Sequence, residues 1–161
     1  IFSDWQNAPV NVMELGISSG ASLLLWAGYF KNGIITGLDI TTPPRKEYLD
    51  TIPNIRMLFG DAYNIENSKF LVDNLLKQDI FIEDGAHDID NQLNALHNYH
   101  PIVKPNGYYV CEDLHIDNLG RYLVDGVYKI KDRNFTMNIF DQHRRLNGLV
   151  DDVMILIQFL N

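Results

Sequence analysis

The sequence lacks the residues from which several classes of protein are built. Its 161 residues include a single cysteine, Cys111, which excludes an intrachain disulfide and a multi-cysteine zinc site. A reducing, cytoplasmic compartment is therefore expected. Lys and Arg number 13 against 21 Asp and Glu, and the net charge of -8 argues against a nucleic-acid partner. No apolar run approaches the ~20 residues that span a bilayer, so no membrane association is expected.

The start of the chain lacks two further features, an initial Met and a leader in which charged residues precede an apolar run. We therefore expect that the start is trimmed or that the chain is a fragment. Its length falls in the range of ~100–200 residues typical of one domain. Because 46% of the residues are hydrophobic, the chain can bury a real core. Residues 1–161 are accordingly expected to form a single domain.

What is present is a regular alternation of short apolar runs and amphipathic stretches. It predicts an α/β fold with a mostly parallel seven-stranded sheet, helices on both faces and an antiparallel hairpin at the C-terminal end. The expected strands are Val10–Leu15, Ile34–Ile40, Ile55–Phe59, Asp79–Glu83, Tyr108–Glu112, Phe135–Phe140 and Val153–Phe159. The expected helices are Ala21–Tyr29, Arg45–Thr51, Ile65–Leu76, Ile89–Tyr99 and Asn118–Val127.

Local signals add detail to this pattern. Ser18 or Ser19 is a suitable N-cap for the first helix. Pro105-Asn106-Gly107 is typical of a turn. A polar loop that contains Arg144, Arg145, Asn147 and Gly148 suits the final hairpin.

The junction of the first strand and the first helix reads Glu14-Leu15-Gly16-Ile17-Ser18-Ser19-Gly20. Gly16 and Gly20 permit a tight turn and the close approach of a ligand, and the helix offers free N–H groups at its amino end. Glu14 would repel a pyrophosphate but can accept from an ammonium group, which favours a zwitterionic ligand. The spacing also differs from the G-x-G-x-x-G of dehydrogenases. A tight turn without a ligand is the alternative.

Further acids follow the second and third strands. Asp39 lies ~20 residues past the glycines and suits paired ribose hydroxyls. Asp61, within Gly60-Asp61-Ala62, is placed to accept from an adenine amino group. The alternatives are a surface or capping role for Asp39 and an ordinary N-cap for Asp61.

The most specific pattern follows the fourth and fifth strands, which run into Glu83-Asp84-Gly85-Ala86-His87 and Cys111-Glu112-Asp113-Leu114-His115. Asp84 and Asp113, with Glu112 or Glu83 beside them, would repel one another unless they are protonated or neutralised by a cation. Oxygen ligands suit Mg²⁺, and a histidine such as His87 suits proton transfer at neutral pH. The alternative is that the acids are caps or loop residues and His87 is solvated.

With these residues identified, the chain resembles the class I S-adenosylmethionine-dependent methyltransferases, and more narrowly the metal-dependent sugar O-methyltransferases of macrolide biosynthesis. The matching segments are VMELGISSGASL, GLDI, GDA, FIEDGAH and PIVKPNGYYVCEDLH. They run from about Asn11 to His115. The specific part is D-G-[AS]-H followed by P-x-G-x-Y-V-x-E-D-L.

The resemblance implies a Rossmann-like methyltransferase fold and gives each matched residue a role. Those implied to bind S-adenosylmethionine are Glu14, Gly16, Ser18, Gly20, Asp39, Asp61 and Ala62. Asp84 and Asp113, with Glu112 as a further candidate, would ligate Mg²⁺. His87 would be the general base, with Asp84 beside it in the catalytic set.

The implied activity is Mg²⁺-dependent O-methylation of a small-molecule hydroxyl, on a sugar or a phenolic compound. Ser18 stands where the superfamily often has Gly, and the segment after Glu112-Asp113-Leu114 is short, which leaves the acceptor open. Two alternatives stay open, a metal-independent methyltransferase and a non-catalytic S-adenosylmethionine-binding module. Phe2 and Trp5 are expected to be exposed and available to a partner, so a homo-oligomer is also open. Cys111 is expected in the core.

Overall fold

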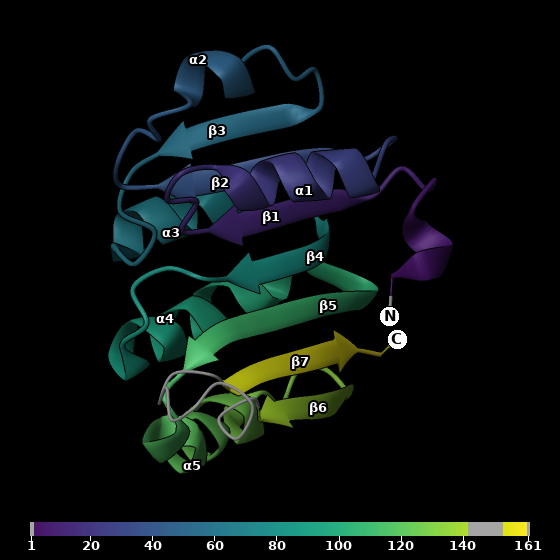
Figure 1. Cartoon of the computed structure of the whole chain (residues 1–161). Coiled ribbons are helices and arrows are strands. Elements are labelled where there is room, and N and C mark those ends of the chain that lie inside the picture. The colour runs from purple at the N-terminus through teal and green to yellow at the C-terminus, as the bar shows by residue number, and fades with distance from the viewer. Residues whose placement is uncertain (1, 142–152, 161) are drawn as a thin grey trace.

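A computed structural model describes residues 2–141 and 153–160 of the chain and contains a single twisted sheet (Figure 1). Its strands are β1 (Asn11–Leu15), β2 (Ile34–Asp39), β3 (Ile55–Phe59), β4 (Gln78–Glu83), β5 (Val103–Leu114), β6 (Phe135–Asp141) and β7 (Val153–Phe159). Their order is β3-β2-β1-β4-β5-β7-β6. The strands from β1 to β5 pair in parallel, whereas β7 pairs antiparallel with both β5 and β6. The predicted mostly parallel sheet with its antiparallel hairpin is confirmed.

Helices cover both faces of this sheet, as predicted. The α-helices are α1 (Ala21–Tyr29), α2 (Lys46–Leu49), α3 (Ile65–Asn74), α4 (Ile89–Tyr99) and α5 (Leu119–Arg121). In Figure 1, α1 lies in front of the sheet, whereas α3 and α4 lie behind it. Short 3₁₀ turns occupy η1 (Ser3–Trp5), η2 (His100–Ile102), η3 (Ile116–Asn118) and η5 (Val127–Lys129), and η4 (Tyr122–Gly126) is a π-helical turn.

The strand pattern explains the two layers, because successive side chains point to opposite faces. Val12 packs in the cluster on the α1 face, whereas Met13 and Leu15 join the cluster beneath α3 and α4. On β4, Ile80 and Ile82 belong to the first cluster and Phe81 to the second. The strand is therefore buried on both faces, as its apolar run predicts.

The order of the strands reverses at β1, which lies between β2 and β4. Connections after β1 and after β4 leave the sheet on opposite faces, so a crevice opens at the carboxyl ends of these two strands. Four of the predicted site residues follow a strand or lie near its end at this edge: Gly16, Asp39, Asp84 and Asp113. The sheet therefore brings the predicted site residues to one side of the molecule.

Some expected elements differ from the structure. The single helix predicted over Asn118–Val127 is wrong, because this stretch forms η3, α5, η4 and the start of η5. Gly120 and Gly126 lie within it, and glycine disfavours a continuous helix. The helices at residues 46–49 and 65–74 are shorter than predicted. The loop that contains Arg144, Arg145, Asn147 and Gly148 lies outside the described residues.

Two local predictions also need correction. The turn expected at Pro105-Asn106-Gly107 is part of β5, where a register shift against β4 accommodates extra residues and Asn106 adopts a φ of 62°. The N-cap of α1 is Gly20, with a φ of 79° and no side-chain cap, rather than Ser18 or Ser19. A left-handed cap conformation favours glycine over a residue with a Cβ atom.

The N-terminal aromatic residues are half-buried rather than exposed. The Phe2 ring lies 6.2 Å from that of Phe30 and 5.2 Å from that of Tyr108, and the Trp5 ring lies 5.4 Å from Tyr108. These contacts use the rings within the chain, so they do not support the expected partner surface there. Cys111 is buried, as predicted. Among the described residues, the helices are too short or too polar to span a bilayer.

Gly37 in the middle of β2 gives a prediction about packing. A Cβ atom there would lie 2.5 Å from Ile17 Cγ2 and 2.9 Å from Leu23 Cδ1, so α1 packs on the sheet only because this side chain is missing. We expect Gly37→Ala to lower the free energy of unfolding by about 1–3 kcal/mol through overpacking. Urea denaturation measures this change.

Gly28 in α1 is the matched control, because a Cβ atom there would meet open space. Gly28→Ala should stabilise the protein by up to about 1 kcal/mol through helix propensity. Equal effects of the two substitutions would contradict the packing explanation.

Candidate active site

The turn after β1 is pressed against the end of β4. Gly16 has a φ of 79°, and a Cβ atom on it would overlap the backbone carbonyl of Asp84. The N–H of Gly16 donates to the Leu38 carbonyl at 2.9 Å, and the N–H of Asp84 donates to the Leu15 carbonyl at 3.0 Å. The first glycine of the motif is therefore required by a close backbone approach.

Asp39 ties the glycine turn to the end of β2. Its Oδ2 accepts from the N–H groups of Ile17 at 2.9 Å and Ser18 at 3.0 Å, and its Oδ1 accepts from the N–H of Thr41 at 2.8 Å. Burial acts to raise the pKa of Asp39, but these hydrogen bonds outweigh it and hold the pKa below its usual range. Asp39 is therefore an anion that both braces the turn and faces the crevice.

The crevice contains a cleft of about 280 Å³ that extends from the glycine turn past the ends of β2 and β3. It is lined by Leu15, Gly16, Leu38, Asp39, Ile40, Gly60, Asp61, Ala62, Tyr63, Gly85 and Ala86. Asp61 is exposed, and its Oδ1 accepts from the N–H of Tyr63 at 2.9 Å. The N-cap of α3 is Asn64, so Asp61 is not the ordinary helix cap that was the alternative.

A more polar recess of about 340 Å³ adjoins this cleft and shares Gly16, Asp39 and Gly85 with it. Its remaining lining residues are Ile17, Ser18, Ser19, Ala21, Ser22, Asp84, His87 and Asp113. The two spaces together join most of the predicted cofactor residues to Asp84 and Asp113, whereas Glu14, Gly20 and Glu112 line neither of them.

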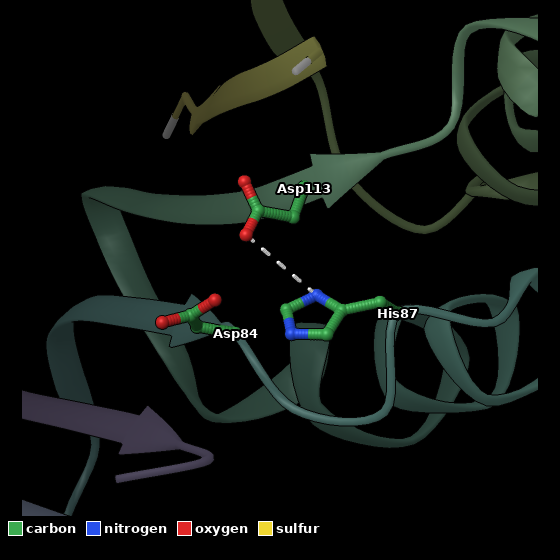
Figure 2. Close-up of side chains that lie close together, drawn as sticks. All are labelled: Asp84, His87 and Asp113. Atoms are coloured by element: carbon green, nitrogen blue, oxygen red, sulfur yellow. Dashed lines mark ion pairs between the residues drawn. The ribbon is translucent and has the colours of Figure 1, made fainter. Parts of the chain in front are cut away.

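Within the recess, Asp84, His87 and Asp113 form a cluster. Asp84 follows β4, His87 lies in the loop before α4, and Asp113 lies near the end of β5 (Figure 2). One ligand atom from each residue lies within 4.8 Å of the others, and His87 Nδ1 is 3.9 Å from Asp113 Oδ2. Asp88 rather than Asp84 caps α4. The acids therefore converge on one space.

The charges of this cluster are costly without a counterion. Burial, followed by the nearby charge of Asp113, raises the pKa of Asp84 to about 6, although His87 acts in the opposite direction. Burial, with Asp84 and Asp113, raises the pKa of Glu112 to about 7. A divalent cation would offset this repulsion.

Glu112 lies beside the cluster rather than within it. Among the described residues, the group whose ligand atoms come together consists of Asp84, His87 and Asp113. Glu112 is half-buried, and its carbonyl accepts from the Gln92 side chain at 3.2 Å. Its predicted role as a metal ligand stays a prediction, and the structure adds His87 to the candidate ligands.

Backbone strain is concentrated at this site. Among the described residues, left-handed φ values outside glycine occur at Ser18 (44°), His87 (53°), Asp113 (51°) and Asn106. The first three line the polar recess. Asp113 occupies a register shift between Cys111 and Leu114 against β7, and such a bulge redirects a side chain. Strain of this kind persists where surrounding contacts hold it and often marks a functional site.

Glu14 is a buried carboxyl at the end of β1, with 2% of its surface exposed. Burial raises its pKa to about 8, a hydrogen bond with Ser22 counteracts this, and Asp84 and Glu112 raise the pKa further. Its Oε2 has no hydrogen-bond partner among the described residues. The carboxyl can therefore accept from a cationic donor that reaches this side of the turn.

Tyr63 is a site residue that the sequence reasoning missed. It lines the cleft, and its hydroxyl donates to Glu83 Oε1 at 2.7 Å while accepting from the Ala86 N–H at 2.8 Å. No sequence motif marks this residue, because its partners are 20 and 23 positions away. The only signal is its place two residues after Asp61.

Comparisons with known proteins show what the whole chain is similar to. No family model matches the chain. It is 29% identical over 120 residues to 8-demethyl-8-alpha-L-rhamnosyl tetracenomycin-C 2'-O-methyltransferase of Streptomyces olivaceus. It is 32% identical over 124 residues to mycinamicin VI 2''-O-methyltransferase of Micromonospora griseorubida. Each alignment covers 70% of this chain but only 31% and 29% of the respective relative.

Among solved structures, MycE methyltransferase of the mycinamycin biosynthetic pathway, in complex with Mg and SAH, has a TM-score of 0.76. The identity is 24%, and the match covers 99% of this chain and 47% of MycE. The fold is thus the Rossmann-like fold of the class I methyltransferases. The predicted resemblance to sugar O-methyltransferases is confirmed at the level of sequence similarity, for a chain that spans less than half of these relatives.

The raised pKa of Glu14 predicts a pH effect on stability. Between its ordinary pKa of 4.5 and its folded pKa of about 8, the folded chain binds a proton that the unfolded chain has lost, so the stability falls as the pH rises. Glu14→Gln cannot ionise. We expect it to add on the order of 2 kcal/mol to the unfolding free energy near pH 8 and little near pH 5.

Denaturation curves of both proteins across this pH range measure the difference. Asp39→Asn should lower the stability to the same extent throughout this range, because a carboxyl with a lowered folded pKa contributes stability that is complete above its ordinary pKa of 3.8 and is lost only at lower pH. A stabilisation by Glu14→Gln that does not change with pH would contradict the buried charge.

Proposed function

We propose that residues 1–161 form a methyltransferase domain that uses S-adenosylmethionine and Mg²⁺ to methylate a hydroxyl of a small molecule, with a sugar as the first candidate. The observation that carries the proposal is the convergence of Asp84, His87 and Asp113 beside a cleft built on Gly16. A sugar is the first candidate because one of the similar proteins is named as a 2'-O-methyltransferase of a rhamnosyl tetracenomycin.

The cleft suits S-adenosylmethionine along its length. The glycine turn gives the cofactor backbone access near Gly16 and Gly20, and the unpaired Oε2 of Glu14 suits its ammonium group. Asp39 would hold the ribose hydroxyls, since it lines the cleft at the end of β2 and is held there as an anion. Asp61 and Ala62 would contact the adenine. Ser18 borders the polar recess, where the methionine part would lie.

The cluster likewise suits a hard divalent cation. Asp84 and Asp113 offer carboxylate oxygens near one another, with Glu112 close enough to affect the same charges. Mg²⁺ binds through few carboxylates and keeps several waters, which fits an accessible recess. When bound, the cofactor supplies an electrophilic methyl group and the ion lowers the pKa of a coordinated hydroxyl.

The residues of the chain would supply a general base and would hold the acceptor hydroxyl in position. His87 would take the proton of the acceptor hydroxyl, and Asp113, whose Oδ2 lies 3.9 Å from Nδ1, would orient the imidazole. The 84–87 loop borders both the cleft and the recess, so it would hold the acceptor oxygen near the cofactor. Such alignment of two reactants provides much of the acceleration in a direct transfer.

Removal of the base is the direct test. We expect His87→Ala to reduce methyl transfer by about 10²–10⁴-fold, which is the usual contribution of general-base catalysis. Mass spectrometry with S-adenosylmethionine and a panel of glycosides and phenols measures the product and its acceptor class. His97→Ala is the control, because His97 is exposed and contacts the Asp125 carbonyl instead. Equal transfer by both variants would exclude His87 as the base.

The requirement for a metal ion has a separate pH signature. Because the pKa of Asp84 is about 6 and that of Glu112 about 7, protons compete with the ion at low pH. Mg²⁺ should therefore raise the melting temperature more at pH 8 than at pH 5, and Asp84→Asn should remove most of this effect. Without Mg²⁺, the protein should lose stability as the pH rises through the pKa values of Asp84 and Glu112.

Two results would redirect the proposal. Methyl transfer that survives EDTA would favour the metal-independent methyltransferase. Binding of S-adenosylhomocysteine without transfer to any acceptor would favour the non-catalytic module. Homo-oligomer formation and a cytoplasmic location stay predictions.

A further inference from the structure

The loop that carries Asp84 and His87 is held by a series of hydrogen bonds that runs from the buried Glu83 to the exposed backbone of Ala86. The Ala86 N–H donates to Tyr63 Oη at 2.8 Å, and the Tyr63 hydroxyl donates to Glu83 Oε1 at 2.7 Å. The same Oε1 accepts from the Gly85 N–H at 3.3 Å. On its other side, Glu83 Oε2 accepts from the Cys111 thiol at 3.5 Å. These bonds connect the loop to β4 and β5.

The anchor of these hydrogen bonds is the buried carboxyl of Glu83. Glu83 is fully buried, and it pairs with Cys111 in the parallel ladder between β4 and β5. Its side chain lies on the face of the sheet that α3 and α4 cover, because it follows Phe81 with a period of two. Tyr63 packs half-buried against the same cluster. The hydroxyl of Tyr63 is therefore held by the core, not by the loop that it contacts.

The loop also fits closely around the tyrosine. A Cβ atom on Gly85 would overlap Tyr63 Oη, and one on Gly16 would overlap the Asp84 carbonyl. The 84–87 segment thus lies between the glycine turn on one side and Tyr63 on the other. His87, at the end of the segment, keeps a φ of 53°, a conformation that needs support from its surroundings.

We propose that Tyr63 is a positioning residue for the active site: its hydroxyl, anchored on Glu83, holds the Ala86 amide and so sets the placement of Asp84 and His87. The inference rests on the proposed function in assigning a metal and a base to those two residues. Tyr63 also lines the cleft, so the side chain that contacts the cofactor space is the one that supports the metal-binding loop. Its effect is exerted through the loop backbone.

The test compares Tyr63→Phe with Tyr99→Phe. The Tyr99 hydroxyl also donates a 2.7 Å hydrogen bond, but its acceptor is the carbonyl of Ala62 in the connection between β3 and α3 rather than a group connected to the 84–87 loop. Each variant loses one hydroxyl and the 2.7 Å hydrogen bond that it donates, and Tyr63→Phe also loses the bond from the Ala86 N–H. Melting temperatures establish that both fold and give the general loss of stability.

Two readouts then separate positioning from stability. We expect Tyr63→Phe to weaken Mn²⁺ binding, measured by electron paramagnetic resonance, by about tenfold, which is typical of a lost supporting contact at a metal site. We also expect faster hydrogen exchange of the Ala86 amide by NMR. Tyr99→Phe should leave both near the wild-type values.

Tyr63→Phe with unchanged Mn²⁺ affinity and unchanged Ala86 exchange would overturn the inference. So would equal changes in the two variants. If the wild-type chain itself binds no Mn²⁺, the metal part of the proposed function fails. The exchange rate of Ala86 then still decides whether Tyr63 holds the loop.

Discussion

The mutual repulsion of carboxylates at one edge of the sheet is the constraint on which the site depends. Parallel pairing of β4 and β5 places Asp84 and Asp113 near each other, and burial adds to the cost of ionising Asp84. A basic residue would relieve this cost. In the part of the chain that the structure describes, the group placed among the acids is His87, which can accept a proton or bind a metal. The arrangement is therefore one that a cation or a bound proton completes.

The sheet separates two buried carboxyls that serve different parts of this edge. Glu14 faces α1 and has an oxygen without a partner among the described residues, whereas Glu83 faces α3 and α4 and accepts three hydrogen bonds. Glu14 therefore suits a ligand that brings a hydrogen-bond donor, whereas the hydrogen-bond donors of Glu83 come from the protein itself. The same alternation of side chains along the strands thus leaves Glu14 able to bind a ligand and makes Glu83 a structural anchor.

Much of this could be predicted from the sequence because it depends on local spacing. Strand periodicity placed Asp84 and Asp113 at the ends of adjacent parallel strands, and the glycines of 16–20 marked the turn that the backbone contact with Asp84 requires. The role of Tyr63 could not be predicted, since it depends on how a loop packs across the sheet. The helix expected over Asn118–Val127 fails for a different, local reason, because Gly120 and Gly126 interrupt it.

The close backbone approach between Gly16 and Asp84 also restricts how such a site can diversify. A side chain or an inserted residue at either point would separate the two halves of the crevice, so neither segment is free to adapt to a new acceptor. Changes of substrate range would instead have to arise where the backbone is less confined, as in the run of short turns that follows β5. Selectivity and chemistry would then evolve on different segments of the same edge.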